Sequence, residues 1–246
     1  MKILALDSSG LVASVALLEN DNLVAEFTVN NKKTHSQTLL PMLDEVVNAA
    51  GIELDAVDAI AIAAGPGSFT GLRIGAATVK GLSLALDKPV VPVPTLEGLA
   101  YNFWGSDRLI CPIMDARRNQ VYTGLYRFDE AGNLVTEMDQ IPMDVNELID
   151  LLLEKDEEVQ FTGDGIQVYG SQILSKMKHA RLAPAHLNKQ KAGSVAYAGA
   201  YRYAHEQYIN GDDFAPEYLR MSQAERERKE KGERNESVMA GRRGPI

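Results

Sequence analysis

The chain has 246 residues, of which 45% are apolar and 24% are charged. This composition is typical of a globular protein and excludes a fibrous or wholly disordered chain. No apolar run approaches the ~20 residues that span a bilayer, and the first acid, Asp7, comes too early for a signal peptide. Cys111 is the only cysteine, which excludes an internal disulfide framework and a cysteine-rich zinc site. We expect a cytosolic location.

Charge is unevenly distributed along the chain. The formal net charge is −9, and residues 221–246 carry seven basic and five acidic side chains. The remainder therefore holds 18 basic and 29 acidic side chains, a net charge of −11. Such a body repels phosphate backbones, and the sequence has no basic patch before its last residues. We predict that residues 221–246 form a charged, mobile tail.

The first half of the chain predicts strands that alternate with helices. The first helix-period apolar face starts after Ser36, and Pro41 is compatible only with a first turn, so that turn is placed close to Thr38. Thr95 is suited to cap a third helix. The predicted strands cover 3–6, 11–18, 23–29, 59–64 and 90–93, and the predicted helices cover 36–50, 69–86 and 95–104.

The pattern then begins again. Asp7 and Asp115 each end an apolar strand that precedes a hairpin, and Asn-Leu-Val enters a third strand at Asn22 and at Asn133. Two generic hairpins that match by coincidence are the alternative to a duplicated α/β fold. We predict lobes over 1–106 and 107–220. The second lobe is predicted to hold strands over 113–115, 121–128, 133–135 and 159–162 and helices over 145–153, 167–177 and 194–208.

The turn after the first strand is a candidate for facing a nucleotide. The small residues Ser8 and Ser9 let a phosphate approach backbone amides, and Asp7 is placed to orient Mg²⁺ or a water. A strand that ends in this way is typical of the actin and sugar-kinase superfamily. A plain hairpin turn, with Asp7 bonded to its own backbone, is the alternative.

The second half offers weaker candidates for the same role. Asp115 is followed by Arg117 and Arg118, two long cations where small residues are needed, and these are suited instead to anions or to a partner's carboxylates. Gly163 and Asp164 follow a strand, where a nucleotide-facing turn competes with an ordinary strand-to-helix turn. An ATP-dependent phosphotransferase or ATPase that acts alone is therefore one hypothesis for this chain.

The most specific segment is the glycine-rich stretch from Gly65 to Gly75. It enters a helix but lacks the lysine of a P-loop. Small residues recur four apart along that helix, and each interior glycine costs about 1 kcal/mol relative to alanine. This cost indicates close packing against either the lobe's own sheet or a helix of another chain.

With this segment, the chain resembles the TsaB family, the non-catalytic subunits of the bacterial complex that makes threonylcarbamoyladenosine in tRNA. The resemblance covers residues 1 to about 220. It is also carried by Ala5-Leu6-Asp7-Ser8-Ser9, by His35-Ser36 with Leu39-Leu40-Pro41, by Asp115-Ala116-Arg117-Arg118 with Val121-Tyr122, and by Pro216-Glu217-Tyr218-Leu219-Arg220.

The resemblance implies a two-lobed, actin-like α/β fold with mixed sheets flanked by helices, and a scaffold role. It implies pairing with the catalytic paralogue TsaD through the N-terminal lobes, joined by the ATPase TsaE. No cofactor is expected on this chain alone, although ATP and Mg²⁺ fit the full complex. Contact with tRNA is expected to be indirect. A homodimer is expected where the partner is absent.

The resemblance also implies the loss of a metal site. TsaD is similar in its first lobe and holds a metal ion with His-x-Glu-Gly-His, where this chain has Thr95-Leu96-Glu97-Gly98-Leu99. A hydroxyl and an isobutyl group cannot replace two imidazole ligands. We therefore expect neither catalytic nor metal-binding residues, which argues against a metallopeptidase, the third hypothesis.

The two long helices of the first lobe are the predicted partner surface. The structural alternative is that their apolar residues face their own sheet. The candidate contacts are Leu39, Leu43, Val46, Val47, Gly71, Gly75, Thr78 and Leu82.

Overall fold

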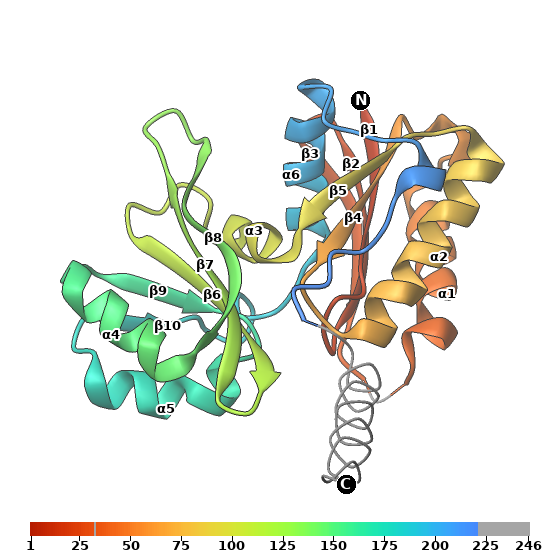
Figure 1. Ribbon diagram of the computed structural model, residues 1–246. Coiled ribbons are helices and arrows are strands. Elements are labelled where there is room, and N and C mark those ends of the chain that lie inside the picture. The colour runs from red at the N-terminus through yellow and green to blue at the C-terminus, as the bar shows by residue number, and fades with distance from the viewer. Residues whose placement is uncertain (32, 221–246) are drawn as a thin grey trace, which may run out of the picture.

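The computed structural model describes residues 1–31 and 33–220, so the predicted tail over 221–246 lies outside the described residues. Two five-stranded sheets form the centres of two lobes (Figure 1). The first sheet contains β1 (Lys2–Asp7), β2 (Ala13–Glu19), β3 (Asn22–Val29), β4 (Ala59–Gly65) and β5 (Val90–Pro94). The second contains β6 (Leu109–Arg117), β7 (Gln120–Phe128), β8 (Leu134–Asp144), β9 (Val159–Thr162) and β10 (Ala180–Leu182).

The two sheets have the same topology. The strand order is β3-β2-β1-β4-β5 in the first and β8-β7-β6-β9-β10 in the second. In each sheet the first strand of the lobe pairs antiparallel with the second strand and parallel with the fourth. This repeat agrees with the duplication predicted from Asp7 and Asp115, and the two-lobed α/β fold class is confirmed.

Helices cover both faces of each sheet. The α-helices are α1 (His35–Ala50), α2 (Phe69–Leu86), α3 (Thr95–Ala100), α4 (Val145–Lys155), α5 (Ile166–Lys176) and α6 (Ala192–Ala204), with 3₁₀ turns at Leu54–Ala56, Tyr101–Phe103 and Gly211–Asp213. Helices α1 and α2 bury their apolar faces on one side of the first sheet, and α6 covers the other side. Helices α4 and α5 cover one side of the second sheet, and α3 covers the other. Helices α3 and α6 therefore lie between the two sheets (Figure 1).

The last part of the second predicted lobe packs on the first lobe instead. Helix α6 packs mainly against β1, β2 and β4, and a Cβ added at Gly199 would lie 2.6 Å from the Cβ of Ala61. The second face of the first sheet is lined by small apolar residues such as Ala5 and Ala61, which would be left in water without this helix. The chain after β10 thus returns to the first lobe.

Two helices and one strand show the differences from prediction that have a local physical cause. Helix α1 begins at His35, so Pro41 lies inside it, on the exposed side where the carbonyl group it leaves unpaired can meet water. Helix α3 ends at Ala100 rather than Trp104, and Thr95 does not cap it, because its Oγ1 accepts a hydrogen bond from the Gly65 N–H at 3.1 Å. Strand β10 was not predicted because it is only three residues long.

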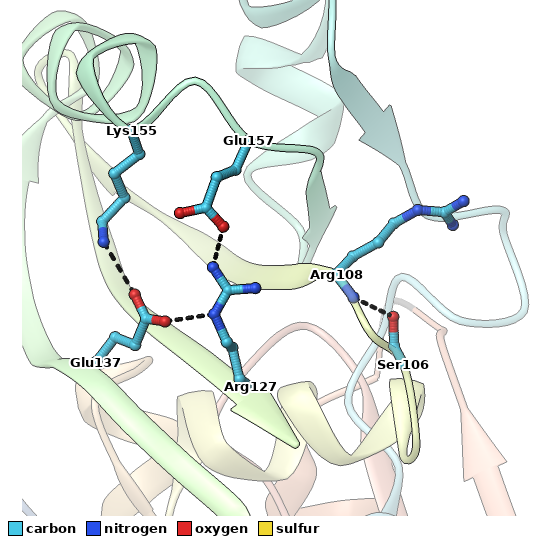
Figure 2. A network of polar contacts seen from close by, with 6 residues as sticks. All are labelled: Ser106, Arg108, Arg127, Glu137, Lys155 and Glu157. Carbon is cyan, nitrogen blue, oxygen red and sulfur yellow. Dashed lines mark hydrogen bonds and ion pairs between the residues drawn. The ribbon is translucent and has the colours of Figure 1, made fainter. Parts of the chain in front are cut away.

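An ion-pair network joins β7, β8 and the end of α4 (Figure 2). Arg127 donates hydrogen bonds to Glu137 and Glu157, and Lys155 Nζ lies 2.9 Å from Glu137 Oε2. Burial acts to raise the pKa of the Glu137 carboxyl, but hydrogen bonds from Lys155 and Arg127 outweigh it and hold that pKa below its usual range.

Replacing Arg127 should therefore weaken the second lobe. We expect Arg127→Met to lower the free energy of unfolding by about 1 kcal/mol, because the pairs are only partly buried. The loss should shrink at high salt, which screens the repulsion left between Glu137 and Glu157. Urea unfolding at low and high salt measures this, with Arg181→Met as the control, since Arg181 lies 4.0 Å from its nearest carboxylate oxygen. Equal losses in the two variants would contradict the prediction.

Within the described ranges, no helix is both long enough and apolar enough to cross a bilayer.

Candidate functional site

A cleft of about 490 Å³ lies where the two lobes meet. The β1–β2 loop and the start of α2 line it from the first lobe. The β6–β7 hairpin and the start of α5 line it from the second lobe, and residues 217–220 cross it. The candidate turns that follow β1 and β6 therefore meet at one site. Their equivalent positions in the two duplicated lobes predict this.

The Asp7 carboxylate does not line this cleft. It is 2% exposed, and its Oδ1 accepts hydrogen bonds from the Ser9 N–H at 2.8 Å and from the Ser9 hydroxyl at 2.6 Å. Burial raises the pKa of this carboxyl to about 6, although the Ser9 hydrogen bonds and nearby His35 oppose the rise. Asp7 thus holds its own turn in shape, which matches the plain-turn alternative.

The β1–β2 loop is covered by the glycine-rich start of α2. A Cβ at Gly67 would lie 2.2 Å from the Ser9 carbonyl oxygen, and one at Gly71 would lie 2.1 Å from that of Ser8. The Ser8 hydroxyl donates to the Gly71 carbonyl at 2.9 Å, and the Ser68 N–H donates to the Ser9 carbonyl at 2.6 Å. The close approach indicated by the glycines is therefore made to the lobe's own loop.

This packing corrects the predicted partner surface. Leu39, Leu43 and Val46 are buried against the first sheet, because they form the apolar face by which α1 covers it. Gly71 and Gly75 are buried against the β1–β2 loop. Their burial leaves them no surface for a partner. The partly exposed members of the predicted set are Val47, Thr78 and Leu82, of which Val47 and Leu82 also pack against the core.

The second lobe brings two predicted carboxylates together. The Asp115 N–H donates to Asp164 Oδ1 at 3.2 Å, and the Tyr169 hydroxyl lies 3.3 Å from Asp115 Oδ1. Burial raises the pKa of the Asp164 carboxyl, and nearby Asp115 adds to the rise. Gly163 has a φ of +96°, and a Cβ there would lie 2.2 Å from the Ile113 carbonyl oxygen, so glycine is required at this turn.

Thr95 and Leu99, the two positions where the resemblance implies lost metal ligands, serve the fold here. The Thr95 hydroxyl is 1% exposed and accepts from Gly65, and Leu99 is 1% exposed within the core between α3 and the second sheet. Glu97 pairs with Arg202 of α6 at 2.6 Å. Among residues 1–31 and 33–220, no three His, Cys, Asp or Glu side chains gather as a potential metal site.

Sequence reasoning missed the segment that crosses the cleft. The Glu217 N–H donates to the Ala64 carbonyl at 2.7 Å, the Tyr218 ring lies 4.7 Å from that of Phe69, and an Arg220 Nη donates to the Ala116 carbonyl at 2.6 Å. This segment therefore links the two lobes at the cleft. Its sequence was a motif of the resemblance, and that motif was the available signal for a place in the site.

Known proteins resemble this chain over most of its length. A family model described as TsaD: tRNA N6-adenosine threonylcarbamoyltransferase matches residues 22–228. A Bacillus subtilis protein named tRNA threonylcarbamoyladenosine biosynthesis protein TsaB is 34% identical over 230 residues, which cover 92% of this chain and 96% of the relative. Its Escherichia coli namesake is 38% identical over 135 residues, or 54% of this chain and 58% of that one.

A solved structure gives the same picture of the fold. The Pseudomonas aeruginosa protein described as uncharacterized with similarity to peptidase YEAZ superposes with a TM-score of 0.77 and 28% sequence identity. The superposition covers 89% of this chain and 99% of that chain. None of these comparisons supports a phosphotransferase that acts alone.

Proposed function

The chain belongs to the TsaB family of tRNA threonylcarbamoyladenosine biosynthesis proteins, and from this premise we propose that it is a non-catalytic subunit of the modification complex. A TsaD-type subunit pairs with it and carries out the transfer to adenosine. A TsaE-type ATPase joins the pair, and ATP and Mg²⁺ act in that full complex.

One observation carries the non-catalytic role: both positions that match metal ligands of TsaD are committed to the fold. Thr95 accepts a backbone hydrogen bond, and Leu99 lies in the core. Neither offers a nitrogen ligand.

The pairing surface is the outer side of α1 and α2, which we term the outer α1–α2 surface. Leu40 is 55% exposed and Leu84 is 78% exposed, so each offers apolar side-chain surface that a partner could cover. Small side chains flank Leu84, so the backbone of α2 is open there to the close approach of a partner helix. The outer α1–α2 surface consists of Leu40, Ala77, Gly81, Leu84 and Ala85. The isolated chain is expected to form a homodimer through it.

A substitution at Gly81 tests this surface without disturbing the fold. A Cβ there meets nothing within 4 Å, and arginine is a better helix former than glycine. We expect Gly81→Arg to abolish co-purification with the TsaD-type subunit while the thermal unfolding of the isolated chain stays the same or improves. Sedimentation of the variant should also lose the homodimer.

Leu174→Arg is the matched control, because Leu174 is 51% exposed on α5 of the other lobe. It should pair normally. Retained pairing by Gly81→Arg would contradict the proposed surface. Calorimetry with Mg-ATP tests the role itself, since tight binding and turnover by the purified chain would contradict a non-catalytic subunit.

A further inference from the structure

The β6–β7 hairpin ends in an unusual turn. Arg117, Arg118 and Asn119 have φ values of +66°, +56° and +59°, three successive non-glycine residues in the left-handed region. Arg117 pairs with Gln120, so Arg118 and Asn119 form the two-residue loop of the hairpin. Two-residue loops with both φ values positive strongly favour asparagine and glycine. The long side chain at the first loop position, Arg118, is therefore a choice that the fold does not require.

Polar contacts on both sides hold the turn in this conformation. The Arg117 N–H donates to Asp115 Oδ1 at 2.9 Å, and the Asn119 side chain donates to Asp144 Oδ2 at 2.8 Å. The Asn119 carbonyl also accepts from the Val145 N–H at 3.0 Å, at the start of α4. These contacts fix the backbone and use the nearby carboxylates Asp115 and Asp144 to do so. Strain held in place by its surroundings is typical of functional segments.

The two arginine side chains point into solvent. The Arg117 side chain is 87% exposed, and its Nε lies 3.7 Å from Asp115 Oδ2, too long for a hydrogen bond. Arg118 is exposed, and no carboxylate of the described residues forms an ion pair with it. Arg220 adds a third guanidinium beside the turn, where it donates to the Ala116 carbonyl. The fold thus gathers cations at the cleft rim that are far apart in the sequence.

We propose that the turn of Arg117 and Arg118 binds the phosphodiester backbone of RNA. The inference rests on the proposed function, and it adds a direct RNA contact on this chain to a role expected to be indirect. Guanidinium groups donate two parallel hydrogen bonds to a phosphate, and two arginines on a rigid turn are suited to successive phosphates. Such contacts position the nucleic acid without reading its sequence.

The test uses the full-length chain paired with its TsaD-type subunit. The probe is a fluorescently labelled transcript of a tRNA anticodon stem–loop, titrated over a salt series. Arg117→Gly and Arg118→Gly should each weaken binding about tenfold and reduce the slope of log affinity against log salt by about 0.7 to 0.9. Both variants should unfold at the same temperature as the unaltered chain or higher, because glycine relieves the left-handed conformation. Arg181→Ala, at an arginine that is 63% exposed on β10, should change neither value.

The outcomes separate this inference from the proposed function. Unchanged affinity and salt slope in a double variant that combines Arg117→Gly with Arg118→Gly overturn the inference and leave the pairing intact. Loss of co-purification in the double variant also overturns it, because the arginines would then contact protein carboxylates. If the unaltered chain fails to pair, the proposed function fails, and the same salt series on the isolated full-length chain decides the inference.

Discussion

Gly71→Ala should lower the free energy of unfolding by about 3 kcal/mol or more, whereas Gly81→Ala, the same change further along α2, should raise it by about 1 kcal/mol. The opposite signs follow from the two faces of one helix. A Cβ at Gly71 would lie 2.1 Å from the backbone oxygen of Ser8, which cannot move without displacing the β1–β2 loop. A Cβ at Gly81 meets open space, so only the gain in helix propensity remains.

Chemical unfolding followed by circular dichroism measures both changes. The pair is internally controlled, because the substitution, the helix and the loss of backbone entropy in the unfolded state are the same. Equal effects in the two variants would mean that the loop does not rest on α2.

The glycines of α2 also mark a limit of sequence reasoning. Their spacing correctly indicated close packing on this helix, but it did not identify what packs there. Gly71 and Gly75 approach the β1–β2 loop, while Gly81 lies four residues from Ala77 on the outer side. Small residues on the inner face and on the outer face of α2 give the same four-residue spacing in the sequence. Only the position of the first sheet shows which of them face the β1–β2 loop and which face outward.

The duplicated fold was predictable because both lobes show the same order of local sequence patterns. Each lobe begins with an apolar strand that carries an aspartate at or near its end, Asp7 in β1 and Asp115 in β6, and hairpin and helix periods follow in the same order. The place of α6 was not predictable in this way. That helix covers the first sheet although it follows the second in the chain, and the choice depends on which apolar face would otherwise stay exposed.

The sequence predicted where the site lies, but it did not predict how the side chains are oriented there. Equivalent strand ends placed Asp7 and Asp115 near one cleft, and Asp164 joined Asp115 there. The direction of the Asp7 side chain depends on its hydrogen bonds with Ser9 in the same turn. An aspartate at this place can form several such local hydrogen bonds, and the sequence does not say which one forms. Residues that reach the cleft from the far end of the chain, such as Glu217, depend on long-range packing that no local pattern encodes.

The Asp7→Asn variant should gain stability relative to the unaltered chain as the pH rises. The pKa of the Asp7 carboxyl is raised to about 6, against 3.8 for the ordinary group, because burial disfavours its charge. The folded state therefore binds this proton more tightly than the unfolded state does. The resulting stability is fully present below the unfolded pKa and is lost as the pH rises through the folded pKa. The neutral amide of the variant would not titrate, and it keeps an oxygen that can accept from Ser9.

The measured quantity is the free energy of unfolding of the variant minus that of the unaltered chain. This difference should rise by about 2 kcal/mol between about pH 4 and about pH 7, whatever constant offset the new amide adds. Asp129→Asn gives a control, because hydrogen bonds from Asn133 hold the pKa of Asp129 below its ordinary value: its difference should stay nearly flat between about pH 4 and about pH 7 and change with the opposite sign only below about pH 4. A flat difference for Asp7→Asn would show that the carboxylate is solvated and turned toward the cleft. It would then be available to orient Mg²⁺, as the phosphotransferase hypothesis requires.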